Sequence, residues 1–68
     1  MTERDFVDIF KEKIEALKLL RDLEALSSLH DFLFKYKYLY QGIWKDCFDK
    51  YRVLSDEITT ELGRKFRN

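Results

Sequence analysis

The sequence predicts an all-α protein, and three observations support this fold class. Apolar residues recur at intervals of three and four along most of the 68-residue chain, a spacing that places them on one side of a helix. The chain has no proline and two glycines, so the ends of its helices have to be read from capping residues. Such capping signals occur at three points. We therefore expect three helices, arranged as an antiparallel hairpin with a short third helix.

The first helix is expected to span about residues 3–25. Thr2 followed by Asp5 has the spacing of a capping box, in which each side chain accepts a hydrogen bond from the other residue's backbone. Glu3, Asp5 and Asp8 also place negative charge where a helix N-terminus favours it. The predicted apolar face of this helix comprises Phe6, Ile9, Phe10, Ala16, Leu17, Leu20 and Leu23.

A tight turn is predicted at Ser27 and Ser28, followed by a second helix over residues 29–54. Ser28 and Asp31 repeat the capping spacing, and a short connection favours antiparallel neighbours. Trp44 flanks the apolar stripe of this helix, and we expect it to lie in the core rather than at an interface. The stripe itself comprises Leu29, Phe32, Leu33, Tyr36, Tyr40, Ile43, Cys47, Tyr51 and Leu54.

A short third helix is expected over residues 56–62. Ser55 followed by two acidic residues is a third N-terminal signal. Gly63 is a suitable residue just beyond a helix C-terminus, and residues 63–68 would then form a basic tail. The short apolar stripe of this helix consists of Ile58 and Leu62.

Residues 34–40 allow a second interpretation, because aromatic and other side chains alternate there with a period of two. This alternation and the aromatic residues are typical of β-strands, and Gly42 could form the turn that follows. A single strand needs a pairing edge, and no other segment resembles a strand. We predict a helix here, with a strand that pairs between two copies of the chain as the alternative.

The opposite side of the predicted second helix is the candidate interaction site. A helix with large apolar groups on both sides needs two surfaces to pack against, and so small a chain can hardly supply both. A single cysteine cannot form an internal disulfide, so oligomerisation is the remaining way to stabilise the domain. We expect a homodimer with a four-helix-type core, a contact with another protein, or both. The residues of this predicted second face are Phe34, Tyr38, Gln41, Lys45, Phe48 and Arg52.

The balanced charge of the chain disfavours nucleic acid and membranes as partners. Thirteen basic and thirteen acidic residues give a net charge of zero, so no overall field attracts polyanions or anionic lipid. No apolar run approaches the roughly 18 residues of a membrane span, and the acidic first residues with a free cysteine predict a cytoplasmic protein. The alternative is a small nucleic-acid-associated transcriptional regulator that uses the basic and aromatic face of the second helix and the C-terminal tail.

Candidate catalytic residues are few. His30 beside Asp31 could act as an acid–base pair, but Cys47 lies 17 residues from His30, about 25 Å along one helix. One cysteine and one histidine cannot make a four-ligand zinc site, and Asp46 with Asp49 offers too few ligands for another metal. We therefore expect no enzyme activity, no metal or other cofactor and no small-molecule substrate. The predicted function is that of a small adaptor, inhibitor or regulatory subunit that acts through protein contacts.

Overall fold

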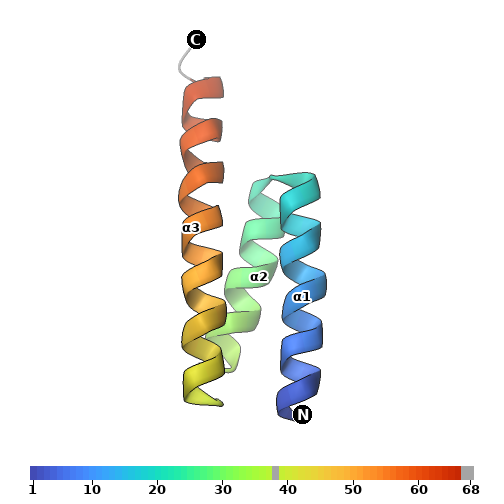
Figure 1. Ribbon diagram of the computed structural model, residues 1–68. Helices are drawn as coiled ribbons and strands as arrows, with labels where there is room; N and C mark the ends of the chain where they lie inside the picture. Colours follow the sequence, from blue (N-terminus) through green and yellow to red (C-terminus); the bar gives the residue numbers. More distant parts are fainter. Residues whose placement is uncertain (38, 67–68) are drawn as a thin grey trace.

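The structure, a computed structural model, describes residues 1–37 and 39–66, and these residues form three α-helices (Figure 1). The helices are α1 (Glu3–Leu20), α2 (Leu23–Lys35) and α3 (Gln41–Phe66). The predicted all-α class is confirmed. No β-strand occurs in the described ranges, so the alternation in residues 34–37 and 39–40 does not produce one there; Tyr38 lies outside the described residues.

The three helices run up, down and up, with α2 packed behind α1 and α3 (Figure 1). The helix α3 is the longest of the three and extends past the turn that joins α1 to α2. This arrangement differs from the predicted one, in which the third helix was short. Three predicted boundaries are wrong: the turn at Ser27 and Ser28, the continuous helix over residues 29–54, and the helix start at Ser55.

The start of α1 is the boundary that the sequence predicted correctly. The Asp5 amide donates to the Thr2 hydroxyl oxygen at 3.1 Å, and the Thr2 amide donates to the Asp5 carboxylate at 3.3 Å. Both halves of the capping box are therefore formed. Two of the four N–H groups that a helix start leaves without partners are satisfied in this way.

The first turn was predicted at Ser27 and Ser28, and this prediction is wrong. The chain turns at Arg21, whose backbone is left-handed (φ 46°, ψ 44°), and Asp22 then caps α2 by accepting a hydrogen bond from the Ala25 amide at 2.8 Å. Aspartate is as good a cap as serine, and the left-handed residue before it ends α1. Both serines lie inside α2.

This earlier turn changes which residues of the first predicted stripe are buried. Leu20 and Leu23 flank the turn and are 63% and 64% exposed. Ile14, which the predicted stripe omitted, is buried, as are Phe6, Phe10 and Leu17. The stripe was therefore right at Phe6, Phe10 and Leu17, missed Ile14, and was wrong at Leu20 and Leu23.

The predicted continuous helix over residues 29–54 is broken between Lys35 and Gln41. Tyr36 ends α2, and Tyr40 has a left-handed backbone (φ 53°) while its carbonyl accepts the Trp44 amide at 2.9 Å. Aromatic residues are only moderate helix formers. The break folds α3 back and brings the rings of Tyr36 and Tyr40 to within 6.4 and 6.2 Å of the Phe6 ring. Tyr36 and Tyr40, at the two ends of the break, thereby pack against the core.

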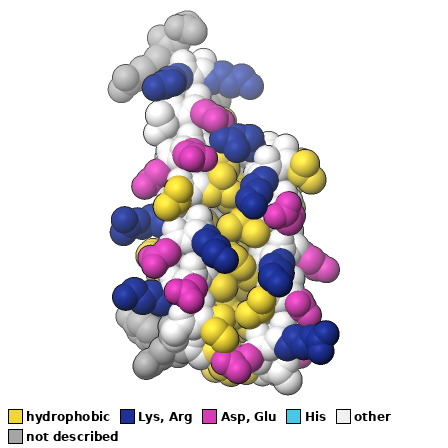
Figure 2. Space-filling model, viewed as in Figure 1, with side chains coloured by type: hydrophobic (Ala, Val, Ile, Leu, Met, Phe, Trp, Pro, Cys, Tyr) yellow, Lys and Arg dark blue, Asp and Glu magenta, His cyan; other side chains and the backbone are white. Residues whose placement is uncertain are grey.

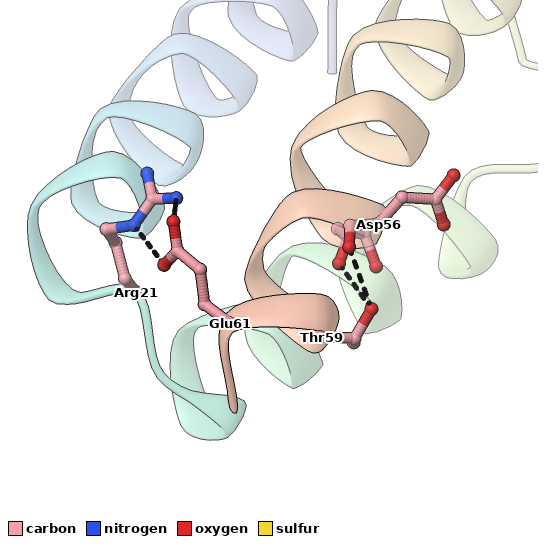
Figure 3. A network of polar contacts seen from close by, with 5 residues as sticks. Arg21, Asp56, Thr59 and Glu61 are labelled. Atoms are coloured by element: carbon pink, nitrogen blue, oxygen red, sulfur yellow. Dashed lines mark hydrogen bonds and ion pairs between the residues drawn. The ribbon is translucent and has the colours of Figure 1, made fainter. Parts of the chain in front are cut away.

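The third predicted helix start, at Ser55, is also wrong, because α3 continues through this residue to Phe66. The Thr59 hydroxyl donates to the carbonyl oxygens of Ser55 and Asp56 at 2.9 and 3.2 Å (Figure 3). Such bonds let Thr sit inside a helix without an N-terminal role. Gly63 likewise lies within α3 and not beyond its end.

The core combines residues from all three helices. The Phe6 and Phe32 rings stack with centroids 5.1 Å apart, and the Trp44 indole N–H donates to the Leu33 carbonyl at 2.7 Å. Trp44 is buried, so its predicted place in the core is confirmed. The buried residues are Phe6, Phe10, Ile14, Leu17, Leu26, Leu29, Phe32, Leu33, Trp44, Cys47, Leu54 and Ile58.

Candidate functional site

The predicted second face is divided between two helices. Phe34 lies in α2, whereas Gln41, Lys45, Phe48 and Arg52 lie in α3. Lys45 and Arg52 are exposed and Phe48 is half-buried. Tyr38 and the side chain of Gln41 are outside what the structure describes. The prediction that these residues share one helix is therefore wrong, because the chain breaks between Phe34 and Gln41.

The two phenylalanines of that face meet each other across the α2–α3 interface. Their ring centroids lie 6.0 Å apart in an edge-to-face arrangement, and Phe48 also stacks on Trp44 at 5.1 Å. His30 lies 4.4 Å from the Phe34 ring, and Phe34 remains 38% exposed. We call the group formed by these side chains the aromatic cluster; it comprises His30, Phe34, Trp44, Phe48 and Tyr51. Through the aromatic cluster, α2 packs against α3.

A groove of about 560 Å³ lies on the other side of α3, between α3 and α1. Figure 2 shows this face: a band of apolar side chains runs between the two helices, with Lys or Arg and Asp or Glu along both of its sides. We call it the α1–α3 groove. Its lining comprises Val7, Phe10, Lys11, Ile14, Glu15 and Lys18 from α1, and Cys47, Lys50, Val53, Leu54 and Glu57 from α3.

The apolar lining of the α1–α3 groove consists of a buried floor, the half-buried Val7 and the exposed Val53. Phe10, Ile14, Cys47 and Leu54 are each less than 9% exposed. Val53 is 61% exposed, although a valine gains about 1.5–3 kcal/mol when it is fully buried. Val53 was not among the predicted site residues, because it lies outside the predicted apolar stripe of the second helix.

Two contacts fix the register between α1 and α3. At one end the Tyr40 hydroxyl donates to the Met1 carbonyl at 2.6 Å. At the other, the Arg21 guanidinium donates to both carboxylate oxygens of Glu61, at 2.6 and 3.0 Å (Figure 3). Each contact joins residues 39 or 40 positions apart. The first contact joins the starts of α1 and α3, the second joins the end of α1 to the C-terminal half of α3, and the two helices run in the same direction (Figure 1).

The Arg21–Glu61 pair is also the clearest electrostatic feature of the molecule. The hydrogen bond from Arg21, and then its positive charge, hold the pKa of the Glu61 carboxyl below its ordinary value. The same hydrogen bond raises the pKa of Arg21. This bidentate pair is the kind that gives geometric specificity, and here it fastens α3 to the α1–α2 turn.

The sequence argument that His30 and Cys47 lie about 25 Å apart along one helix is wrong, because His30 lies in α2 and Cys47 in α3. The His30 ring nitrogen Nδ1 lies 3.4 Å from an Asp31 carboxylate oxygen, and both side chains are exposed. Cys47 is buried, and its burial raises the pKa of the thiol, which opposes formation of the reactive thiolate. Within residues 1–37 and 39–66, no three His, Cys, Asp or Glu side chains gather in a way that could hold a metal ion.

A second hollow, of about 490 Å³, lies between α1 and α2. Charged and small side chains dominate its lining, and Lys13 donates across it to the Ser28 hydroxyl at 3.0 Å. It therefore offers less apolar surface than the α1–α3 groove. Its lining comprises Glu12, Lys13, Ala16, Leu20, Asp22, Glu24, Ala25 and Ser28.

None of the helices in the described part of the chain combines the length and the apolar character that crossing a membrane requires.

Comparison with known proteins identifies no relative: no protein-family model, no curated protein and no solved structure matches the chain. The functional argument therefore depends on the surfaces described above.

Proposed function

We propose that the protein is a small non-enzymatic interaction module that binds a helical surface of another polypeptide in the α1–α3 groove. The observation that carries this proposal is the open apolar band between α1 and α3, whose lining includes Val53, 61% exposed. Open apolar surfaces bordered by polar residues mark interaction sites, and their centres are depleted in charge.

The shape and charge of the α1–α3 groove support a helix as its occupant. Two parallel helices leave a channel into which the apolar stripe of a third helix packs. The rim carries both signs of charge: Lys11, Lys18 and Lys50 are basic, and Glu15 and Glu57 are acidic. A rim of this kind suits a helix with both acidic and basic residues beside its apolar stripe, as helix-in-groove complexes require.

Nucleic-acid binding, the alternative from the sequence, has less support. Lys45 and Arg52 are exposed on α3, but Asp49 and Asp56 are exposed on the same side at helical spacing, so the charge alternates instead of forming a basic stripe. We expect no binding of DNA or RNA by fluorescence anisotropy at about 150 mM salt. Binding that Lys45→Ala with Arg52→Ala abolishes, in a folded protein, would favour the alternative.

Site-specific photo-cross-linking tests the proposal in cells of the native host. A photoreactive amino acid at Val53 probes the α1–α3 groove, and the same amino acid at Arg52 is the matched control, because this neighbour is exposed but does not line the groove. Mass spectrometry identifies the cross-linked polypeptide. We expect one defined product from position 53 and none from position 52. The opposite result would place the partner on the predicted second face and would contradict the proposal.

A further inference from the structure

We infer that the occupant of the α1–α3 groove is an amphipathic helix of another protein, with acidic residues on both sides of its apolar stripe. This inference rests on the proposed function and adds the chemistry of the partner. It is carried by Lys11 and Lys50, which line the groove from opposite sides and have no carboxylate partner in the described part of the chain.

The two lysines lie on opposite rims of the groove because they belong to different helices. Lys11 is in α1 and Lys50 is in α3, and both are exposed. Figure 2 shows basic side chains on both sides of the apolar band. Burial raises the pKa of the Cys47 thiol in the groove floor, and the positive charge of Lys50 opposes this rise, so Lys50 acts on the floor itself. A helix in the groove therefore passes between two ammonium groups.

The acidic residues of the rim already have basic neighbours within the chain. Glu15 accepts a hydrogen bond from the Lys18 ammonium group at 3.2 Å. Glu57 lies close enough to Arg21 to act on it. The pKa of Arg21 is raised by its hydrogen bond to Glu61, and the negative charges of Glu61 and Glu57 add to this effect. Both acidic groups of the groove lining are thus compensated from within the molecule.

The charge that remains for a partner is positive. Across the residues that the structure describes, the ammonium groups of Lys11 and Lys50 form no ion pair and no hydrogen bond. Asp46, one helical turn before Lys50, is exposed and does not line the groove. A partner with carboxylates opposite both lysines gains charge-assisted contacts. A basic partner meets like charges, which disfavour a wrong pairing.

The apolar floor requires these carboxylates to flank an apolar stripe. The floor is buried, whereas Val53 in the same lining is 61% exposed. The lining spans residues 7–18 of α1 and 47–57 of α3, so a helix of about 12 residues matches its length. We therefore expect the partner to repeat large apolar residues at i, i+3 or i+4, and i+7, with Asp or Glu on either side.

A second copy of this chain does not offer such a helix. The apolar stripes of its three helices are already buried in its own core. Within the described helices, no helix carries more than two exposed large apolar residues: Leu19 and Leu20 in α1, Leu23 and Phe34 in α2, and Val53 in α3. An apolar stripe of three turns therefore has to come from a different polypeptide.

Selection from a displayed library of helical peptides tests the charge preference directly. Each peptide carries an apolar stripe over three turns and random residues at the positions that flank it, and the full-length chain is the target. We expect the enriched peptides to carry Asp or Glu on both sides of the stripe and to lose binding to Val53→Glu. Enrichment of Lys, Arg or uncharged residues at these positions, or no enrichment at all, would overturn the inference.

Charge reversal on the rim provides a test that does not depend on how Val53→Glu folds. Lys11→Glu and Lys50→Glu should each weaken binding of the enriched peptide by about ten-fold in fluorescence anisotropy, because an attraction becomes a repulsion. The double variant should select basic flanking residues from the same library. Lys45→Glu is the matched control, since it makes the same change in an exposed residue of α3 that does not line the groove. Equal weakening by Lys45→Glu would contradict recognition in the groove.

Cross-linking from position 53 separates this inference from the proposed function. A cross-linked helix with acidic residues on both sides of its apolar stripe would support both. A cross-linked helix with basic or uncharged residues there, or a second copy of this chain, would leave the proposed function in place and overturn the inference. The absence of any product from position 53 would contradict both.

Discussion

The two sides of α3 differ in what covers them. The side that faces α2 is aromatic, and its rings are in contact with Phe34 and His30 of α2. The side that faces α1 is aliphatic, and Val53 and the rim of the α1–α3 groove remain open. Large aromatic side chains, which are enriched in interaction hot spots, are here used for packing within the chain.

This difference shows how one broken helix changes the location of a candidate site. An unbroken helix over residues 29–54 would have put Phe34 and Phe48 on one open face. The break between Lys35 and Gln41 lets α2 fold against α3, so Phe34 packs on Phe48 at 6.0 Å. An apolar surface between α1 and α3 remains open. Four predictions test this comparison, from the largest expected effect to the smallest.

The largest loss of stability is expected from substitutions in the core, which is formed by residues of all three helices. Leu33 is fully buried, so Leu33→Ala should lower the free energy of unfolding by about 2–5 kcal/mol. Ile43→Ala should cost less, because Ile43 is only half-buried. Leu19 is 83% exposed, and Leu19→Ala should change stability by less than about 0.5 kcal/mol. Urea denaturation of the three variants measures these differences, and a Leu33→Ala curve that matches wild type would contradict the core described here.

The aromatic side of α3 should show the next largest effect, through Trp44. Its indole N–H donates to the Leu33 carbonyl at 2.7 Å in a buried setting. Trp44→Phe keeps an aromatic ring but removes the donor, so we expect a loss of about 1–3 kcal/mol. Denaturant unfolding followed by circular dichroism is the measurement. A loss well below 1 kcal/mol would show that this hydrogen bond does not help to fix α2 on α3.

Sequence periodicity predicted the buried residues better than it predicted the ends of the helices. Phe32, Leu33, Cys47 and Leu54 were all expected on the apolar stripe and are buried, because spacings of three and four hold within each helix wherever it begins. Local capping signals were ambiguous. Ser28 and Ser55 have the residue type of a cap but lie inside helices.

The turn at Arg21 and the groove could not be predicted from local pattern. A left-handed arginine is uncommon, and here the Arg21 side chain is tied to Glu61, 40 residues away. That contact exists only once the helices are assembled. Val53 is similar: its exposure depends on how closely α1 approaches α3, which no spacing within α3 encodes.

Phe34→Ala is a sharper test of the comparison between the two sides of α3. Phe34 is 38% exposed and makes edge-to-face contacts with Trp44 and Phe48, so we expect a loss of about 1 kcal/mol of stability, in the range of single aromatic pairs. Its oligomeric state should match that of the wild type in sedimentation equilibrium. The sequence-based hypothesis expects the opposite result, a folded protein with weakened assembly, and that result would move the interface to the predicted second face.

The smallest effect is expected at the Arg21–Glu61 pair, where the Glu61 side chain is exposed and that of Arg21 is partly exposed, because ion pairs open to solvent contribute little. The Glu61 pKa is lower in the folded chain than its ordinary value. Its contribution is therefore present above that ordinary value and is lost as the pH falls through the folded-state pKa. Glu61→Gln should be slightly less stable than wild type at pH 7, and the difference should vanish in acid. Parallel urea titrations at pH 7 and pH 3 measure it, since the other carboxyls are common to both proteins. A difference that persists unchanged at pH 3 would mean that Glu61 stabilises α3 by packing, and that the ion pair does not set the register between α1 and α3.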